Sequence, residues 1–220
     1  MIEVYSCTEA GEHHENEDAF VVQPHPLDPT CLLGVVADGQ GGQPDGGPAS
    51  RLACRMWMDL AGCEPPQQLF HGGMIDHTLH LVDRELCEEE NAGFTTLVGW
   101  AVWKNHLIGA SVGDSALMLM QGGATKILTD HQFKNPPVGS GAAEAVEFGN
   151  ILTAPWTLLS MTDGVWKYIG WEKLAALAEQ KQGQELIDAA CAACRLRSGA
   201  LQDDFTLVVW HSGSDMETPS

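Results

Sequence analysis

Five short acidic motifs, each beside an apolar run, hold the residues of this chain that are best suited to chemistry. Residues 31–37 run directly into Asp38, and residues 156–162 run into Asp163. Carboxylates at strand ends can converge from distant parts of a chain, and several of them without a basic partner need a hard cation. The spacing therefore predicts a metal site built from Asn16-Glu17-Asp18, Asp38-Gly39, Gly113-Asp114-Ser115, Thr162-Asp163-Gly164 and Asp203-Asp204-Phe205-Thr206.

Short strands that could position these motifs are predicted by apolar or alternating runs bounded by turn residues. The continuous apolar run at residues 31–37 predicts a strand buried on both faces. Lys104-Asn105 joins two strands as a hairpin, and Gly122-Gly123 turns a second pair. The predicted strands cover residues 2–7, 19–23, 31–37, 94–103, 106–112, 115–120, 125–128, 156–161 and 205–211.

Helices are predicted between these strands, at residues 48–60, 66–89, 171–180 and 184–196. In the first of them, Leu52, Met56 and Leu60 recur at four-residue spacing. Residues 39–47 are rich in glycine and predict a loop, and residues 131–150 are weakly patterned. Because many connections are hairpins, we expect mainly antiparallel sheets with helices packed outside them.

Composition narrows the classes of partner. The 220 residues predict one domain over residues 1–211 and a polar tail over 212–220. With 30 acidic against 11 basic residues, the formal net charge is −19, which disfavours nucleic acid and membrane surfaces as partners. Seven scattered cysteines, no signal-peptide pattern and no apolar run of membrane-spanning length lead us to expect a cytoplasmic protein with reduced thiols.

Six motifs follow one another along residues 10–211: Asn16-Glu-Asp-Ala-Phe20, Asp38-Gly-Gln-Gly-Gly42, Gly93-Phe-Thr-Thr96, Val112-Gly-Asp-Ser115, Met161-Thr-Asp-Gly164 and Asp203-Asp-Phe-Thr206. Each is weak alone, but their order and spacing resemble those of the metal-dependent Ser/Thr protein phosphatases of the protein phosphatase 2C type. The resemblance implies an α+β fold, a four-layer αββα sandwich of two antiparallel sheets flanked by helices. It also implies a pair of Mn²⁺ or Mg²⁺ ions at one end of the sandwich.

The resemblance assigns a role to each motif residue. Asp38 is expected to bridge both metals, and Gly39 to offer its backbone carbonyl to the second metal, which Glu17 helps to hold. Asp163 and Asp203 are expected to hold the first metal. Asp114 would touch a third, weaker metal position, while Asp18 and Asp204 are not expected to touch metal.

The implied chemistry is hydrolysis of a phosphomonoester dianion, which repels an anionic nucleophile. Two cations a few ångströms apart neutralise that repulsion and acidify a shared water, so that a metal-bridging hydroxide attacks phosphorus in line. Asp38, Asp163 and Asp203 act through the bound metals and water, and no protein nucleophile is required. We therefore expect hydrolysis of phosphoserine and phosphothreonine in proteins by a compact, bacterial-like member that opposes a Ser/Thr kinase.

The chain departs from the family pattern where substrate would be touched. His13 stands where many members carry a phosphate-binding arginine, and either His13 or its neighbour His14 could hydrogen-bond phosphate, or both could be exposed loop residues. Gln40 stands where eukaryotic members have a histidine assigned as proton donor. Glutamine can position water but cannot act as an acid, so metal-bound water would protonate the leaving group.

The segment after Asp114 is also altered. Ala116 replaces an arginine, and Thr129-Asp130-His131 resembles a family segment that has one more residue. Only residues 132–149 remain for the mobile flap that family members carry, so we expect no packed helical lobe there and a more open site.

These departures keep a second hypothesis open: a catalytically weak phosphoprotein-binding or regulatory module on the same fold. A nuclease conflicts with the acidic charge. A nucleotide loop at Gly39-Gln-Gly-Gly42 lacks the Lys-Ser/Thr that would follow it. Cys191 and Cys194 have the spacing of a zinc pair, but without a second pair they favour core packing.

Overall fold

The computed structural model describes residues 2–12, 15–40, 46–90 and 93–213, and within them two antiparallel five-stranded sheets pack face to face. The first sheet has the spatial order β1 (Ile2–Glu9), β10 (Phe205–Ser212), β9 (Trp156–Met161), β6 (Ala116–Gln121) and β7 (Ala124–Ile127). The second has the order β2 (Asp18–His25), β3 (Asp28–Asp38), β4 (Leu97–Trp103), β5 (His106–Val112) and β8 (Val146–Ile151).

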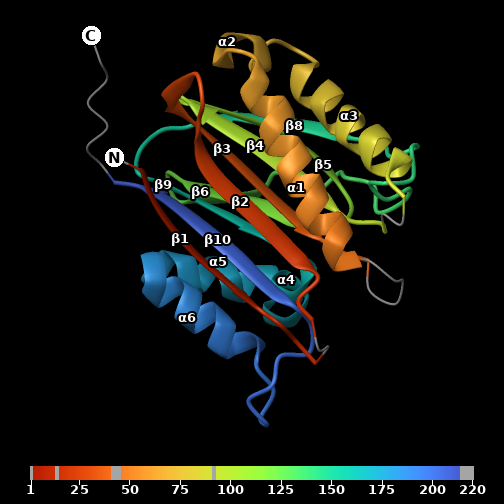
Figure 1. Ribbon diagram of the computed structural model, residues 1–220. Coiled ribbons are helices and arrows are strands. Elements are labelled where there is room, and N and C mark those ends of the chain that lie inside the picture. Colours follow the sequence, from red (N-terminus) through yellow and green to blue (C-terminus); the bar gives the residue numbers. More distant parts are fainter. Residues whose placement is uncertain (1, 13–14, 41–45, 91–92, 214–220) are drawn as a thin grey trace.

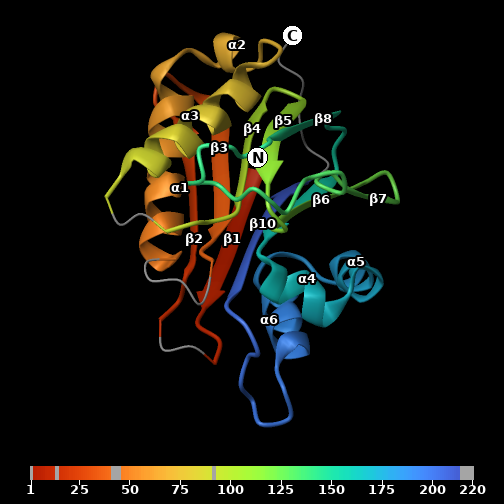
Figure 2. The same ribbon diagram turned by 90° about the vertical axis from the view of Figure 1, so that its right-hand side faces the viewer.

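Helices cover the outer face of each sheet (Figures 1 and 2). The second sheet is covered by α1 (Gly46–Cys63), α2 (Pro66–Leu69) and α3 (Met74–Glu88). The first is covered by α4 (Asp163–Ile169), α5 (Trp171–Gln180) and α6 (Gly183–Cys194). The predicted α+β class and four-layer αββα order are confirmed.

Hydrophobic side chains fill the space between the sheets and the space under each helical layer. In the central layer, Trp100 of β4 meets Trp210 of β10 with ring centroids 5.6 Å apart. Gly34 pairs with Trp100 across β3 and β4, and a Cβ there would lie 2.3 Å from the indole. The glycine is therefore needed for the tryptophan to enter the core.

The helix predicted at residues 48–60 is present, but its core face differs from the prediction. Leu52, Met56 and Leu60 are only partly buried, whereas Trp57 is fully buried. A Cβ on Gly99 of β4 would lie 2.5 Å from the Trp57 ring, so the indole packs directly against the backbone of the sheet. The four-residue spacing of large hydrophobic side chains therefore did not identify the buried face of α1. Small residues that let α1 approach the sheet would have identified it better.

Three other predictions need correction. The helix predicted at 66–89 is two helices, because Gly73 adopts φ +81° between α2 and α3, a left-handed conformation that glycine adopts at little cost. The weakly patterned stretch 131–150 ends in strand β8, and helix α4 begins directly at Asp163. The remaining predicted helices and strands are present with end points shifted by up to three residues.

Residues 132–149 contain no helix, as expected, yet hydrogen bonds connect them to the rest of the protein. The buried carboxylate of Asp83 on α3 accepts the backbone N–H groups of Gly139 at 2.7 Å, Gly141 at 3.1 Å and Ala143 at 3.0 Å. Thr95 and Val138 exchange backbone hydrogen bonds in the same region. One carboxylate therefore attaches this segment to the layer that contains α3.

We expect Asp83→Asn to lower the free energy of unfolding by about 2 kcal/mol, because an amide group would turn a donor toward a buried N–H. Urea denaturation measures the change, with Glu88→Gln on the exposed side of the same helix as the matched variant. The loss should be similar with and without divalent metal. A change below about 0.5 kcal/mol would show that solvent satisfies these amides.

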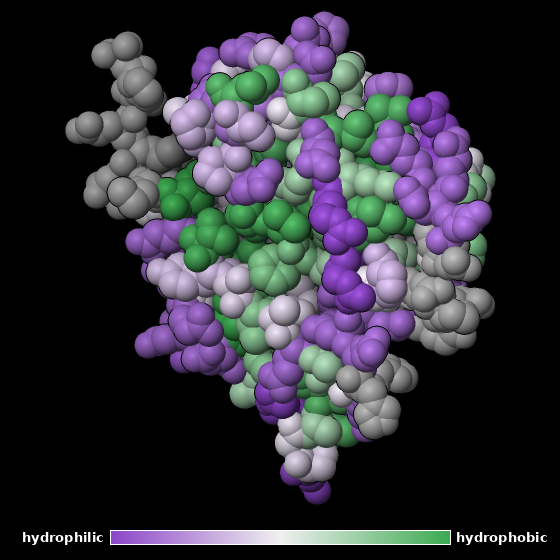
Figure 3. Space-filling view, viewed as in Figure 1, coloured by the Kyte–Doolittle hydropathy of each residue, from purple (hydrophilic) through white to green (hydrophobic). Residues whose placement is uncertain are grey.

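The outer surface carries mixed polar and hydrophobic side chains on the face shown in Figure 3. Val4 on edge strand β1 is 41% exposed. Among the residues that the structure describes, no helix combines the length and the hydrophobicity needed to cross a bilayer.

Candidate active site

The predicted site residues that the structure describes line one cleft of about 420 Å³ at the end of the two sheets. They come from the ends of β3 and β9, the segments before β2 and β10, and the β5–β6 connection. They are Glu17, Asp38, Gly39, Gln40, Asp114, Asp163 and Asp203. His13 and His14 lie outside the described residues. The structure therefore brings together the acidic motifs, while the role of each residue stays a prediction.

Pairing of β2 with β3 places the first acidic groups. Asp18 lies opposite Asp38 in the register of this strand pair, and Gly39 N–H donates to the Glu17 carbonyl at 3.1 Å. A Cβ on Gly39 would lie 2.2 Å from the Gly46 carbonyl oxygen, where α1 begins. Glycine is thus required here because the backbone after Asp38 passes directly against the first turn of the helix.

Hydroxyl groups hold the backbone of Asp38 from the opposite side. The Asp38 N–H donates to Thr96 Oγ1 at 2.9 Å, and Thr95 Oγ1 donates to the Asp38 carbonyl at 2.8 Å. Thr96 Oγ1 in turn lies 2.6 Å from Ser115 Oγ. The motif Gly93-Phe-Thr-Thr96 therefore fixes the position of Asp38 and connects it to the β5–β6 turn.

Helix α4 brings Asp163 into the cleft and joins two other motifs. Thr162 Oγ1, at the start of the helix, donates to Asp18 Oδ2 at 2.8 Å, while Asp18 Oδ1 is buried without a hydrogen-bond partner among the described residues. Trp166 Nε1 donates to the Asp114 carbonyl at 2.9 Å. The helix thus fixes the relative positions of Asp163 and Asp114.

Asp203 and Asp204 are adjacent but have different surroundings. Asp204 is buried and accepts backbone N–H groups from Gly11 at 2.8 Å and Glu17 at 2.7 Å. It therefore secures the segment that carries Glu17. Both residues line the cleft, and Asp203 Oδ1 accepts the Asp204 N–H at 3.1 Å.

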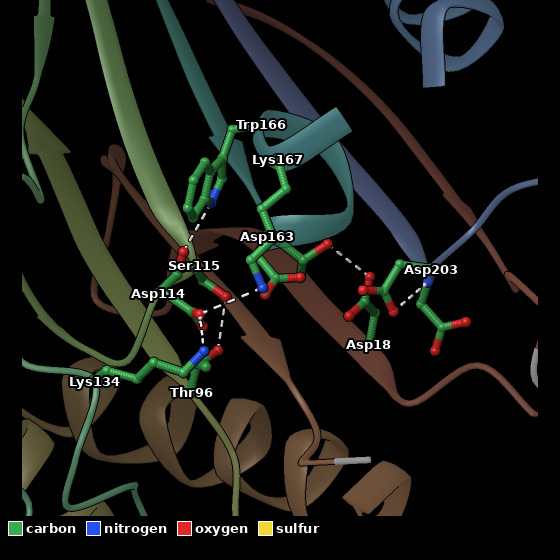
Figure 4. Close-up of polar contacts among 11 residues, drawn as sticks. Asp18, Thr96, Asp114, Ser115, Lys134, Asp163, Trp166, Lys167 and Asp203 are labelled. Atoms are coloured by element: carbon green, nitrogen blue, oxygen red, sulfur yellow. Dashed lines mark hydrogen bonds and ion pairs between the residues drawn. The ribbon is translucent and has the colours of Figure 1, made fainter. Parts of the chain in front are cut away.

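Two lysines near the carboxylates were missed in the sequence. Lys134 Nζ lies 2.5 Å from Asp114 Oδ2, and Lys167 Nζ lies 3.7 Å from the same oxygen (Figure 4). Lys167 also forms an ion pair with Asp163, four residues earlier on α4. The i, i+4 spacing would have indicated that pair had the helix been predicted.

The cleft carries an excess of negative charge. Six acidic residues and one lysine line it among the residues that the structure describes. Burial, and then the charges of Asp18 and Asp163, raise the pKa of Asp38 to about 9. Burial likewise raises the pKa of Asp18 to about 7, with Asp204 and Asp163 adding to the effect.

Asp163 and Lys167 each shift the pKa of the other. Burial raises the pKa of Asp163, and the hydrogen bond from Lys167 opposes that shift. Burial lowers the pKa of Lys167, but its hydrogen bond to Asp163 and the charges of the neighbouring carboxylates outweigh burial and leave that pKa raised. Lys167 is therefore held in its charged form beside Asp163.

The donor chemistry fits divalent cations. All the acidic side chains in the cleft offer oxygen ligands, burial and then the charges of neighbouring carboxylates raise the pKa of Asp38, and one oxygen of buried Asp18 has no hydrogen-bond partner in the described part of the chain. Within the described ranges, however, no three acidic, histidine or cysteine side chains already surround one point as ligands. Asp163 contacts Lys167 instead, so a metal ion at Asp163 would have to displace that ammonium group.

Known phosphatases resemble this chain in sequence or in structure. The sequence profile described as protein phosphatase 2C matches residues 9–198, whereas no curated protein sequence matches. A solved bacterial serine phosphatase superposes with a TM-score of 0.80 at 19% identity, covering 97% of this chain and 99% of its own. Stp1 from Staphylococcus aureus gives 0.78 at 20% identity, covering 96% and 95%, respectively. The catalytic domain of the phosphatase PstP, solved with two manganese ions, gives 0.74 at 20% identity, covering 96% and 97%.

The structural likenesses establish the fold. The profile match spans most of the chain, and the motifs it includes lie together in the cleft. The chain therefore belongs to the protein phosphatase 2C family.

Proposed function

We propose that this protein hydrolyses phosphoserine and phosphothreonine in proteins and that the reaction depends on a pair of Mn²⁺ or Mg²⁺ ions. The observation that carries the proposal is the convergence of six acidic residues in one cleft of a protein phosphatase 2C fold. The catalytic domain would span residues 1–211, and the protein would act in the cytoplasm against a Ser/Thr kinase.

The side chains divide into two groups around the metal pair. Asp38 would contact both ions, with Asp163 and Asp203 on one of them and Glu17 and the Gly39 carbonyl on the other. When bound, the ions acidify water and neutralise the charge of the phosphate group. The threonine contacts to the Asp38 backbone would keep its carboxylate in place as charge redistributes.

Substrate phosphate would enter a cleft whose lining includes Lys134 and Gln40. The Lys134 ammonium group can attract a dianion, and the Gln40 amide can donate a hydrogen bond to it. Gln40 cannot deliver a proton as an acid, so the proton for the departing serine or threonine oxygen must come from water. His13 and His14 precede Glu17 closely in sequence and would add contacts to phosphate.

An assay on a phosphoserine peptide and an aryl phosphate tests this function. We expect hydrolysis of both with Mn²⁺ or Mg²⁺, and a loss of about 100-fold or more on chelation. Asp163→Asn should lose comparable activity, while Asp188→Asn on the exposed side of α6 should not.

Full activity without divalent metal would refute the proposed mechanism. Tight binding of the phosphopeptide without turnover would instead favour the regulatory module. Hydrolysis of the aryl phosphate alone would contradict a protein substrate.

A further inference from the structure

We propose that Lys134 and Lys167 form a built-in positive charge at Asp114 that takes the place of a third divalent cation. The inference rests on the proposed function, because it concerns how many metal ions that site holds. It replaces the third, weaker metal position that the family resemblance implies at Asp114.

Both ammonium groups approach a single carboxylate oxygen. Asp114 Oδ2 lies 2.5 Å from Lys134 Nζ and 3.7 Å from Lys167 Nζ, and the two lysines point toward it in Figure 4. The Asp114 side chain is only 18% exposed. Its Oδ2 therefore already has two cationic partners, which a metal ion binding at that oxygen would have to displace.

Lys134 is placed by the chain on either side of Asp114. Gly113 N–H donates to the Phe133 carbonyl at 2.8 Å, and Gln132 Nε2 donates to the Ser115 carbonyl at 2.6 Å. The two residues before Lys134 are therefore hydrogen-bonded to the residues on either side of Asp114. This pairing fixes the backbone of Lys134 beside Asp114, and its side chain, which is 64% exposed, reaches the carboxylate from there.

Lys167 is placed by the helix that also supplies Asp163. Its neighbour Trp166 donates to the Asp114 carbonyl at 2.9 Å and stacks on Trp171 with ring centroids 5.2 Å apart. These contacts hold the last turn of α4 against the β5–β6 connection. The Lys167 ammonium group therefore lies between Asp163 and Asp114, in contact with both.

A divalent ion bound to Asp114 would have to displace two ammonium groups or accept them as close neighbours. Repulsion between like charges a few ångströms apart in a partly buried site weakens binding by about tenfold or more. Loss of the ion pairs adds to the penalty. A metal ion on Asp163 would displace Lys167 from that carboxylate and leave Asp114 as its partner, so both lysines would still supply positive charge at this corner.

Counting bound Mn²⁺ tests the inference without reference to turnover. We would titrate the full chain and measure free Mn²⁺ by electron paramagnetic resonance, with calorimetry for affinities. Lys134→Met/Lys167→Met removes both charges but keeps apolar side chains of similar length. Lys126→Met/Lys173→Met, at exposed positions on β7 and α5, makes the same change in net charge elsewhere.

The wild type and the matched control should bind two ions. The Lys134→Met/Lys167→Met variant should bind a third, at least about tenfold more tightly than any third ion in the wild type. Adding Asp114→Asn to that variant should remove the third ion. Thermal unfolding in Mn²⁺ would verify that all variants are folded.

Three outcomes would overturn the inference. A third ion bound equally well by the wild type would show that the lysines do not exclude it. Two ions in both wild type and variant would show that Asp114 is not a metal position even without them. A wild type that binds no Mn²⁺ would refute the proposed function together with this inference, so the two failures are distinguishable.

Discussion

Asp38→Asn is expected to lower kcat/KM for a phosphoserine peptide by on the order of 10³-fold in saturating Mn²⁺. The Asp38 carboxylate is the proposed ligand to both ions, and an amide is a neutral and weaker ligand. In free-energy terms the loss corresponds to about 4 kcal/mol of transition-state stabilisation. Steady-state rates over a range of Mn²⁺ concentrations measure it, together with metal stoichiometry.

Asp28→Asn provides a matched control, because Asp28 lies at the opposite end of the same strand. Its carboxylate accepts hydrogen bonds from Thr30 and from the indole N–H of Trp103. This variant should retain metal binding and nearly full activity. If Asp38→Asn kept both metal ions and more than a tenth of the activity, Asp38 could not be the bridging ligand.

Convergence of the acidic motifs could be predicted from the sequence because each motif borders a strand. Antiparallel pairing of β2 with β3 makes Asp18 and Asp38 neighbours, and pairing of β10 with β9 brings the segments near Asp203 and Asp163 together. In a sandwich of antiparallel sheets, alternate strand ends meet at one edge. The positions of the carboxylates therefore follow from where the strands end, which the sequence pattern predicted, and from the antiparallel sheets that the family resemblance implied.

The two lysines could not be predicted in the same way. Lys134 reaches Asp114 from a segment with no regular pattern, and its placement depends on hydrogen bonds from Gly113 and Gln132. Lys167 depends on α4, a seven-residue helix that begins two residues after the end of β9. A helix so short has a weak periodic signal and is stabilised mainly by tertiary packing.

Other errors had similar causes. Strand β8 is an edge strand that contains Gly149, and glycine inside a strand weakens the sequence signal. The break between α2 and α3 depends on the left-handed conformation of Gly73. In both cases tertiary context determined the outcome where local propensity was nearly neutral.

Without metal, the protein should lose stability as the pH rises from about 4 to about 9. Burial, followed by repulsion from neighbouring carboxylates, raises the pKa of Asp38 from 3.8 to about 9 and that of Asp18 to about 7. Between the unfolded and folded values the folded state binds more protons, so the free energy of unfolding falls with rising pH. The favourable contribution is complete below pH 3.8 and is lost as the pH passes the folded pKa values.

Urea denaturation in chelator at pH 5, 7 and 9 measures this trend. Asp38→Asn should flatten it and should be more stable than the chelated wild type at pH 8 by about 1–3 kcal/mol, because the wild-type carboxyl must take up a proton or bury its charge on folding and the amide does neither. Asp28→Asn should instead lower the free energy of unfolding, because the side-chain and backbone hydrogen bonds from Thr30 lower the pKa of Asp28 and favour its charged form. A chelated wild type whose stability is flat or rises from pH 5 to 9 would contradict the description of the cleft as an uncompensated acidic cluster.

Saturating Mg²⁺ should reverse this pH dependence, so that the free energy of unfolding rises with pH. Metal ligands must be deprotonated, so the affinity for the ions, and with it their stabilisation of the folded state, increases with pH. The same carboxylates that destabilise the metal-free protein at pH 8 would then contribute most to its stability. A single variant, Asp38→Asn, should therefore be more stable than the wild type in chelator and less stable in Mg²⁺, a crossing that a residue with a purely structural role would not produce.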